Sequence, residues 1–194
     1  SGGITQSELL DIGQRMGNRL THRGPDAGDV WSDNNSGLVL AHRRLSIIDL
    51  SGGAQPMSSS SGRYVLTYNG ELYNYRELRA ELVKRGIVFR DHSDTEVLLA
   101  ALSEWPIEKA LSKVVGMFAF ALWDQKEKQL TLGRDRMGEK PLYYGWAGNS
   151  FLFSSELRAF DECPQWEKQI DVDALALFFR HNYVPEPHSI FRGI

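Results

Sequence analysis

The sequence predicts a layered α+β fold in which helices cover a largely antiparallel sheet. Two helical patterns lie next to each other in the chain, at residues 74–86 and 93–105. Strand patterns separated by turn residues follow at 117–123, 129–132, 141–144 and 151–153, and they predict an antiparallel meander. Residues 117–123 are apolar at every position, which is typical of a strand covered on both faces. We therefore expect another layer beyond one sheet and one set of helices.

The remaining elements can be placed in chain order. Thr5 and Glu8 have the spacing of a capping box and predict an amphipathic helix that stops near residues 22–26. Asn69 and Gly70 are expected to end a strand and form a turn that leads into the helix at 74–86. The other expected elements are short strands at 30–31, 38–40, 44–48 and 64–68 and helices at 156–160 and 171–180.

Composition narrows the class of protein. The 194 residues carry a net charge of -3, so no long-range field would attract nucleic acid or anionic membranes. No apolar run is long enough to span a bilayer, and the single cysteine fits a reducing compartment. We expect a cytoplasmic protein with neither nucleic acid nor membrane as a partner. The five histidines lack metal-ligand spacing, so no metal site is expected.

A few polar residues have the chemistry of a binding site. The Asn69 amide and the Gly70 N–H could both face one oxyanion, although Asn-Gly is more often a simple turn. Arg44 could fork onto a carboxylate or lie at the surface. Asp94 could cap a helix or counter an ammonium group, whereas Cys163, flanked by acids, would be a poor nucleophile. The charged residues at 134–136 predict an exposed ion-pair cluster without a chemical role.

Several strings, in this order and spacing, resemble one family. They are HRGPD (22–26), AHRRLSIID (41–49), QPM (55–57), YNGELYN (68–74), SDTE (93–96), GMFAF (116–120) and RDRMG (134–138) followed by PLY (141–143). The set resembles the N-terminal class II glutamine amidotransferase domain of glutamine-hydrolysing asparagine synthetases. The resemblance implies an N-terminal-nucleophile hydrolase fold, a four-layer αββα sandwich, which agrees with the extra layer expected above.

The resemblance also implies roles for single residues. Arg44 and Ile48 would bind the substrate, with Arg44 on its carboxylate, while Glu71 and Asp94 would bind its ammonium group. The Asn69 amide and the Gly70 N–H would stabilise the oxyanion formed when glutamine is hydrolysed to glutamate and ammonia.

The family nucleophile is a cysteine at the mature N-terminus, and this sequence begins with Ser1. We interpret Ser1 as a position downstream of the first family strand and expect the chain as it stands to be inactive. The expected amidotransferase domain is 1–170, and 171–194 would be a helix and the start of a connection to a synthetase domain. That absent domain would use ATP and Mg²⁺, and no cofactor is expected in this one.

The function expected from the resemblance is a glutaminase that supplies ammonia for ATP-dependent amidation of a carboxylate, aspartate by default. Its partners would be glutamine and the synthetase domain, with a homodimer as a further option. Two alternatives stay open, namely a catalytically silent docking or regulatory module and amidation of a sugar carboxylate in surface-polysaccharide synthesis. Amidotransferases of purine or hexosamine synthesis form a third reading, which residues 23–26 and 69–74 disfavour.

Overall fold

The computed structural model describes residues 5–45 and 53–194. Contacts within the chain divide it between Lys140 and Pro141 into two compact units, which we call the N-terminal unit and the C-terminal unit. The expected domain boundary at residue 170 does not coincide with this division. That boundary concerns the family domain rather than local compactness, and it stays a prediction.

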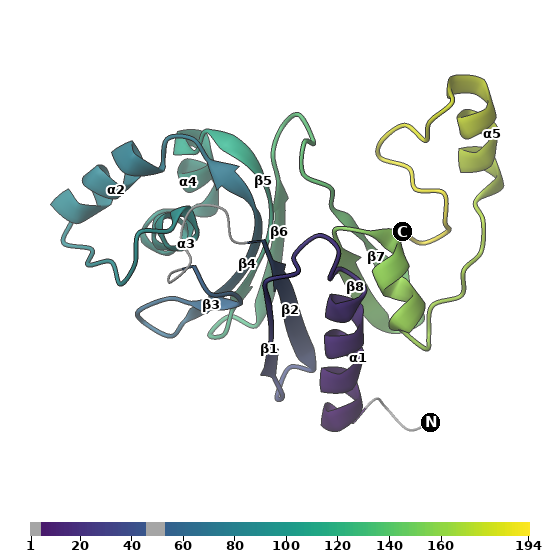
Figure 1. The fold of residues 1–194 in the computed structure, drawn as a ribbon, viewed down its shortest axis with the longest axis horizontal. Helices are drawn as coiled ribbons and strands as arrows, with labels where there is room; N and C mark the ends of the chain where they lie inside the picture. Colours follow the sequence, from purple (N-terminus) through teal and green to yellow (C-terminus); the bar gives the residue numbers. More distant parts are fainter. Residues whose placement is uncertain (1–4, 46–52) are drawn as a thin grey trace. The chain divides into compact units, whose positions relative to one another are not determined.

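The N-terminal unit holds most of the regular structure (Figure 1). Its helices are α1 (Gln6–Asn18), α2 (Tyr75–Lys84), α3 (Asp94–Glu104) and α4 (Ile107–Lys113). Its strands are β1 (Ala27–Asp33), β2 (Leu38–Arg44), β3 (Met57–Ser58), β4 (Tyr64–Leu72), β5 (Gly116–Asp124) and β6 (Gln129–Arg134). The C-terminal unit contains β7 (Tyr143–Ala147), β8 (Ser150–Ser154), a 3-10 helix (Leu157–Glu162) and α5 (Val172–His181).

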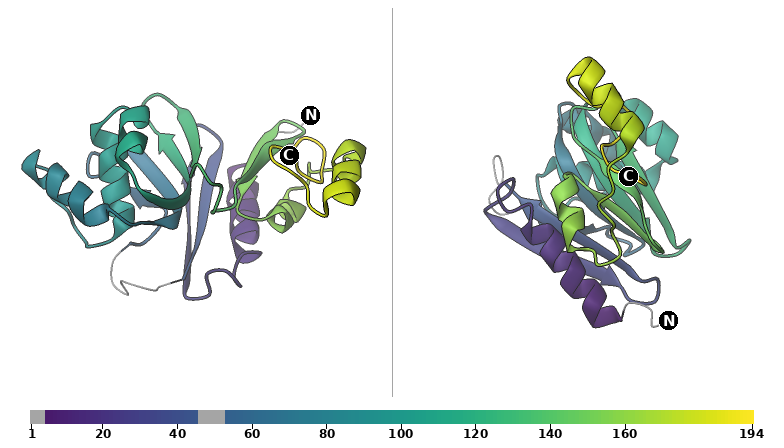
Figure 2. Two further views of the ribbon diagram at one scale, coloured as in Figure 1. Left: turned by 90° about the horizontal axis from the view of Figure 1, so that it is seen from above. Right: turned by 90° about the vertical axis from the view of Figure 1, so that its right-hand side faces the viewer.

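The N-terminal unit is built in four layers, and Figures 1 and 2 show their order. Helix α1 lies on a two-stranded sheet of β1 and β2, and the second sheet has the order β3-β4-β5-β6 with antiparallel pairs. Helices α2, α3 and α4 share a hydrophobic core with β4 and β5 on the far side of that sheet. This is the αββα arrangement expected from the sequence, so the predicted α+β class is confirmed.

Two polar contacts join the sheets across the middle of the sandwich. The ring of His42 on β2 lies with Nε2 3.2 Å from the main-chain oxygen of Tyr68 on β4. The indole Nε1–H of Trp123 on β5 donates to Asp33 Oδ2 on β1 at 3.1 Å. With helices on one face and β1-β2 on the other, β5 is buried from Phe118 to Asp124, as its apolar sequence predicted.

The predicted turn at Asn69 and Gly70 is wrong. Strand β4 continues through both residues to Leu72, and Gly70 pairs with Phe118 on β5. A Cβ at Gly70 would lie 2.8 Å from the Phe118 Cα, so the glycine is needed for close strand approach rather than for a turn. Pairing along all of β5 overrides the local preference of the Asn-Gly pair.

The predicted four-strand meander is also wrong. Strands β5 and β6 pair with each other, but β7 and β8 form a separate two-stranded sheet in the C-terminal unit. The connection between the sheets folds around the buried carboxylate of Asp135. That carboxylate accepts main-chain N–H groups of Phe118, Met137, Glu139 and Lys140. Burial of Asp135 among backbone donors therefore corrects the exposed ion-pair cluster expected at 134–136.

Three helix starts can be compared with their sequence signals. Thr5 forms the predicted capping box with Glu8. Ser93 is the N-cap of α3, and its hydroxyl accepts the Glu96 N–H. Asn74 occupies the N-cap position of α2 but makes no side-chain cap bond. Its amide instead donates to Lys113 O and accepts from Val115 N–H, so it fixes the end of α4.

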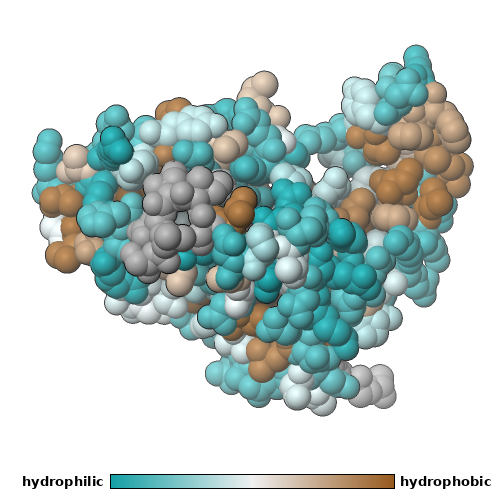
Figure 3. Space-filling view, viewed as in Figure 1, coloured by the Kyte–Doolittle hydropathy of each residue, from teal (hydrophilic) through white to brown (hydrophobic). Residues whose placement is uncertain are grey.

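The C-terminal unit exposes apolar side chains, which Figure 3 shows over α5. Phe179 on α5 and Trp146 on β7 are 75% and 61% exposed. Inside this unit Trp166 packs edge-on between Phe160 and Phe191. Within the described ranges, no helix is both long and apolar enough to cross a membrane.

Candidate functional site

Four of the residues selected from the sequence line one cavity. Arg44, Gly70, Glu71 and Asp94 surround a hollow of about 210 Å³ in the N-terminal unit. They come from the end of β2, from β4 and from the first position of α3. Residues separated by fifty positions in the chain therefore meet at one place, and the roles that the resemblance implies for them stay predictions.

Two further predicted residues have different outcomes. Asn69 precedes Gly70 on β4 opposite Ala119, and it is not among the described residues that line the cavity. Ile48 lies outside the described residues. The roles expected for Asn69 in oxyanion binding and for Ile48 in substrate binding stay predictions.

Asp94 is held by two hydrogen-bond donors on β4 and by its place at the start of α3. One of its oxygens, Oδ2, accepts the Tyr68 hydroxyl at 2.9 Å and the Leu72 N–H at 2.9 Å. Asp94 is also the first residue of α3, where the unpaired N–H groups and the helix dipole favour a negative charge. These interactions stabilise a carboxylate at the edge of the cavity.

The loop before α3 is fixed by two other carboxylates. Glu96, whose side chain is buried, accepts the main-chain N–H groups of Arg90 and Asp91 and the Arg90 Nε. Asp91 Oδ2 accepts the Gly53 N–H at 2.8 Å, while its Oδ1 accepts from Ser93. Partial burial opposes ionisation of Asp91, but the hydrogen bonds from Gly53 and Ser93 outweigh it and lower its pKa.

His42 lines the same cavity as a neutral ring. Burial lowers its pKa to about 4, helped by the nearby Arg44 charge and opposed by the hydrogen bond to Tyr68. Because a carbonyl oxygen can only accept, the neutral ring donates Nε2–H to Tyr68 O. The lowered pKa therefore keeps His42 uncharged at neutral pH, while the acidic and basic side chains among the described lining residues are Arg43, Arg44, Glu71 and Asp94.

Tyr68 and Gln55 are part of the site, although the sequence reasoning gave them no role. Gln55 Oε1 accepts the Tyr68 N–H at 2.6 Å, and its Nε2 donates to Thr95 Oγ1 at 3.4 Å. Both residues lie inside strings that carried the family resemblance, at 55–57 and 68–74. Strand alternation could have placed Tyr68 and Gly70 on one face, but the predicted turn hid that relation.

The arrangement suits a small zwitterion. A guanidinium group presents paired N–H donors that match a carboxylate, and two carboxylates can accept an ammonium group. Arg44 offers the first kind of group, and Glu71 and Asp94 offer the second. The cavity volume is also below the range of about 300–1,000 Å³ common for drug-sized ligands, which favours a ligand of amino-acid size.

Curated relatives align with most of this chain. Asparagine synthetase [glutamine-hydrolyzing] 3 and 1 of Bacillus subtilis are 42% and 40% identical to it, and asparagine synthetase B of Escherichia coli is 40% identical. These alignments cover 98%, 95% and 78% of this chain but only 31%, 28% and 27% of the relatives. The chain therefore spans less than a third of the length of these relatives.

Solved structures share the fold. Glutamine phosphoribosylpyrophosphate amidotransferase from B. subtilis matches with a TM-score of 0.62 at 26% identity, over 82% of this chain and 41% of that chain. The allosteric regulatory enzyme of purine biosynthesis matches with a TM-score of 0.66 at 25% identity, over 83% and 42%. The N-terminal-nucleophile hydrolase fold expected from the sequence is thus confirmed.

A family model described as a glutamine amidotransferase domain matches residues 3–194. The match covers nearly the whole chain and contains every described residue that lines the cavity. Together with the identities above, it confirms the family indicated by the ordered strings. The chain belongs to the glutamine amidotransferase domain family and is homologous to the N-terminal region of glutamine-hydrolysing asparagine synthetases.

Proposed function

We propose that this chain belongs to the glutaminase part of a synthetase, which binds L-glutamine in the cavity and, with an N-terminal cysteine as nucleophile, releases ammonia for ATP-dependent amidation of a carboxylate. The observation that carries the proposal is the convergence of Arg44 with Glu71 and Asp94 around a cavity of amino-acid size. Arg44 would hold the α-carboxylate, and the two acids would hold the α-ammonium. The side-chain amide would then extend toward Gly70.

The chemistry of the proposal needs a nucleophile and an oxyanion site. The thiolate of an N-terminal cysteine would attack the side-chain amide carbon, ammonia would leave, and water would hydrolyse the thioester to glutamate. The only cysteine of these 194 residues, Cys163, is buried in the C-terminal unit and does not line the cavity. The Asn69 amide and the Gly70 N–H would stabilise the tetrahedral oxyanion, where losing one donor typically raises the barrier by about 3 kcal/mol.

Aspartate is the acceptor that we favour. The three relatives cited above carry the name asparagine synthetase and are 40–42% identical to this chain, against 25–26% for the two solved structures. We propose that ATP and Mg²⁺ act in a synthetase domain outside these 194 residues, with that domain as the partner that receives ammonia. The cytoplasmic location and the homodimer stay predictions.

Glutamine binding by this chain tests the proposal directly. We expect isothermal titration calorimetry to detect binding of L-glutamine, and we expect Arg44→Ala to weaken it at least about tenfold, because hydrogen bonds between charged groups contribute about 1.5–3 kcal/mol. Arg85→Ala is the matched control, since Arg85 pairs with Glu104 on the surface and lies outside the cavity lining. A chain that does not bind L-glutamine would support the silent-module alternative and overturn our proposal.

A further inference from the structure

The two oxygens of Asp94 have different surroundings. Oδ2 accepts two hydrogen bonds, from the Tyr68 hydroxyl and from the Leu72 N–H. Among the described residues, no side-chain or main-chain donor is bonded to Oδ1. Asp94 also lines the cavity, so one oxygen is anchored to the protein while the other has capacity to accept from a ligand.

The ring that carries the anchoring hydroxyl has little freedom to move. Tyr68 is 3% exposed and belongs to the hydrophobic core shared by β4 and the helices. Its N–H donates to Gln55, and its main-chain oxygen accepts from His42. The hydroxyl is therefore presented to Asp94 from a fixed position, and its geometry does not depend on a mobile side chain.

The hydroxyl also keeps its proton. Burial raises the pKa of Tyr68, and the negative charges of Asp94 and Glu71 raise it further. Tyr68 therefore remains a donor over the pH range in which proteins are stable. A carboxylate that receives this bond is restrained in rotation about its Cβ–Cγ bond.

We propose that Tyr68 is a positioning residue, whose hydroxyl orients the Asp94 carboxylate so that its second oxygen receives the α-ammonium group of the amino-acid substrate. This inference rests on the function proposed above. Tyr68 acts only through Asp94, and it therefore selects for ligands that carry an ammonium group. A ligand with the same carboxylate and amide but no amine gains no affinity from the hydrogen bond between Tyr68 and Asp94.

A variant that lacks only the Tyr68 hydroxyl tests the positioning role without disrupting the hydrophobic core. We expect Tyr68→Phe to raise the Kd of L-glutamine about tenfold, because the Asp94 carboxylate would no longer be held in the orientation that receives the ammonium group. Glutaramate, which is glutamine without its α-amine, should bind the variant within about twofold of its affinity for the unmodified chain, because it makes no ammonium contact. NMR chemical-shift titration measures both dissociation constants and shows at the same time that the variant is folded.

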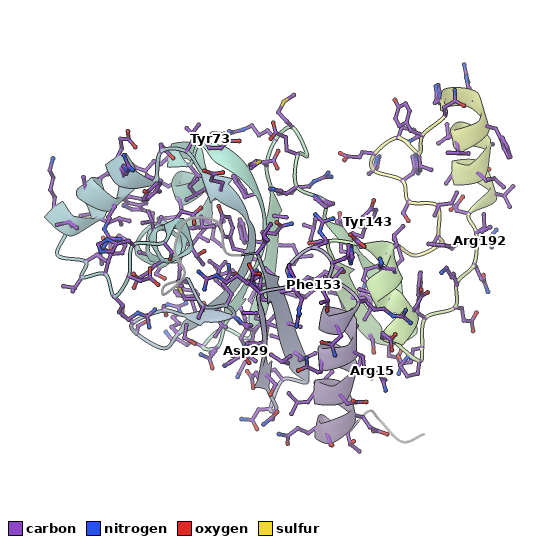
Figure 4. All side chains as sticks on the ribbon, in the orientation of Figure 1. Arg15, Asp29, Tyr73, Tyr143, Phe153 and Arg192 are labelled. Atoms are coloured by element: carbon purple, nitrogen blue, oxygen red, sulfur yellow. The ribbon has the colours of Figure 1, made fainter. Side chains whose placement is uncertain are left out.

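Two further variants sharpen the test. Tyr73→Phe is the matched control, because Tyr73 is 58% exposed beyond the end of β4 (Figure 4) and should leave both affinities unchanged. Asp94→Asn should itself weaken L-glutamine binding, and adding Tyr68→Phe to it should change the Kd by less than about twofold, because the two residues act as one unit.

Each outcome distinguishes this inference from the proposed function. Equal weakening of both ligands by Tyr68→Phe, or additive losses in the double variant, would overturn the positioning role while glutamine binding itself stands. Unchanged affinity for L-glutamine in Tyr68→Phe would overturn it as well. An unmodified chain that binds neither ligand would overturn the proposed function.

Discussion

A single histidine should make the stability of the fold depend on pH. The pKa of His42 is about 4 in the folded chain, against about 6.5 when unfolded, because burial disfavours the charged ring. Between these values the unfolded chain binds the extra proton, so the free energy of unfolding decreases as the pH falls from about 6.5 to about 4. The loss is at most about 3 kcal/mol, because His42 keeps some contact with solvent. Urea unfolding at several pH values measures it.

A variant at the same position isolates this contribution. His42→Gln keeps an N–H donor for Tyr68 O but cannot titrate, so its stability should vary less between pH 6.5 and 4. Asp33 and Asp124, whose pKa values are lowered to about 2, mainly by hydrogen bonds from Lys128 and Arg63, lose their stabilisation at lower pH. Equal pH slopes for the variant and the parent above pH 4 would contradict the assignment to His42.

At the scale of residues, the sequence predicted the location of two charged groups but left their roles untested. Arg44 and Asp94 were selected because a guanidinium matches a carboxylate and an acid matches an ammonium, and both line the cavity. Tyr68 and Gln55 were not selected, because their part in the site depends on contacts with residues far away in the chain. A buried tyrosine in a strand has no sequence signal that separates it from an ordinary core residue.

At the scale of elements, the stability of the loop before α3 should depend on the buried carboxylate of Glu96. Both carboxylate oxygens of Glu96 accept main-chain N–H groups of Arg90 and Asp91. In Glu96→Gln only one oxygen remains, and the NH₂ group that replaces the other is itself a donor that faces an N–H donor. We expect a loss of about 1–3 kcal/mol in the free energy of unfolding, with weaker L-glutamine binding because Asp94 follows this loop. Chemical denaturation and calorimetry measure the two effects.

The same helix offers a matched control. Glu104 ends α3 and pairs with Arg85 at 3.4 Å on the surface, where such pairs contribute less than about 1 kcal/mol. Glu104→Gln should therefore change stability by less than about 1 kcal/mol and leave glutamine binding intact. If both variants had the same effect, the buried network around the loop would have no special importance.

Elements were predictable where local and tertiary preferences agree. Thr5 and Glu8 start α1, and Gly86 follows the end of α2 with a φ of +88°, as their sequence patterns indicate. At Asn69 and Gly70 the local preference is a turn, but pairing with β5 keeps the chain extended. Sequence patterns report local preference, so they fail where strand pairing opposes it.

At the scale of the whole molecule, damage to the C-terminal unit should spare the cavity. Every described residue that lines the cavity falls between His42 and Thr95, in the N-terminal unit. An alanine Cβ at Gly145 on β7 would lie 2.8 Å from the Ile194 Cα, so Gly145→Ala should destabilise the C-terminal unit by about 1–3 kcal/mol. Amide hydrogen exchange should rise in β7 and β8, while the Kd of L-glutamine should change less than about twofold.

A second variant, Gly62→Ala, disturbs the N-terminal unit instead of the C-terminal unit. Gly62 has a φ of +71°, and a Cβ added there would meet no described atom within 4 Å, so Gly62→Ala adds backbone strain of about 1–2 kcal/mol without a clash. It should raise exchange in β3 and β4 but not in β7 and β8. A large loss of glutamine affinity in Gly145→Ala would show that the cavity depends on the C-terminal unit.

The layered architecture was predictable, but the assignment of strands to sheets was not. The apolar run at 117–123 required cover on both faces, and the helices and the sheet of β1 and β2 supply it. The segment around Asp135 separates β5 and β6 from β7 and β8 along the chain, and its hydrogen bonds to main-chain groups cannot be seen in the residue pattern. The assignment of strands to sheets could therefore not be predicted, because it involves hydrogen bonds between residues far apart in the chain.

Strand β4 also restricts how this protein could be redesigned. It pairs with β5 along its full length from Tyr64 to Leu72 and contributes Gly70 and Glu71 to the cavity. An insertion there would move every following side chain to the opposite face of the sheet. Reshaping the cavity would have to begin with side-chain substitutions at the end of β2 or on α3, which shift no strand register.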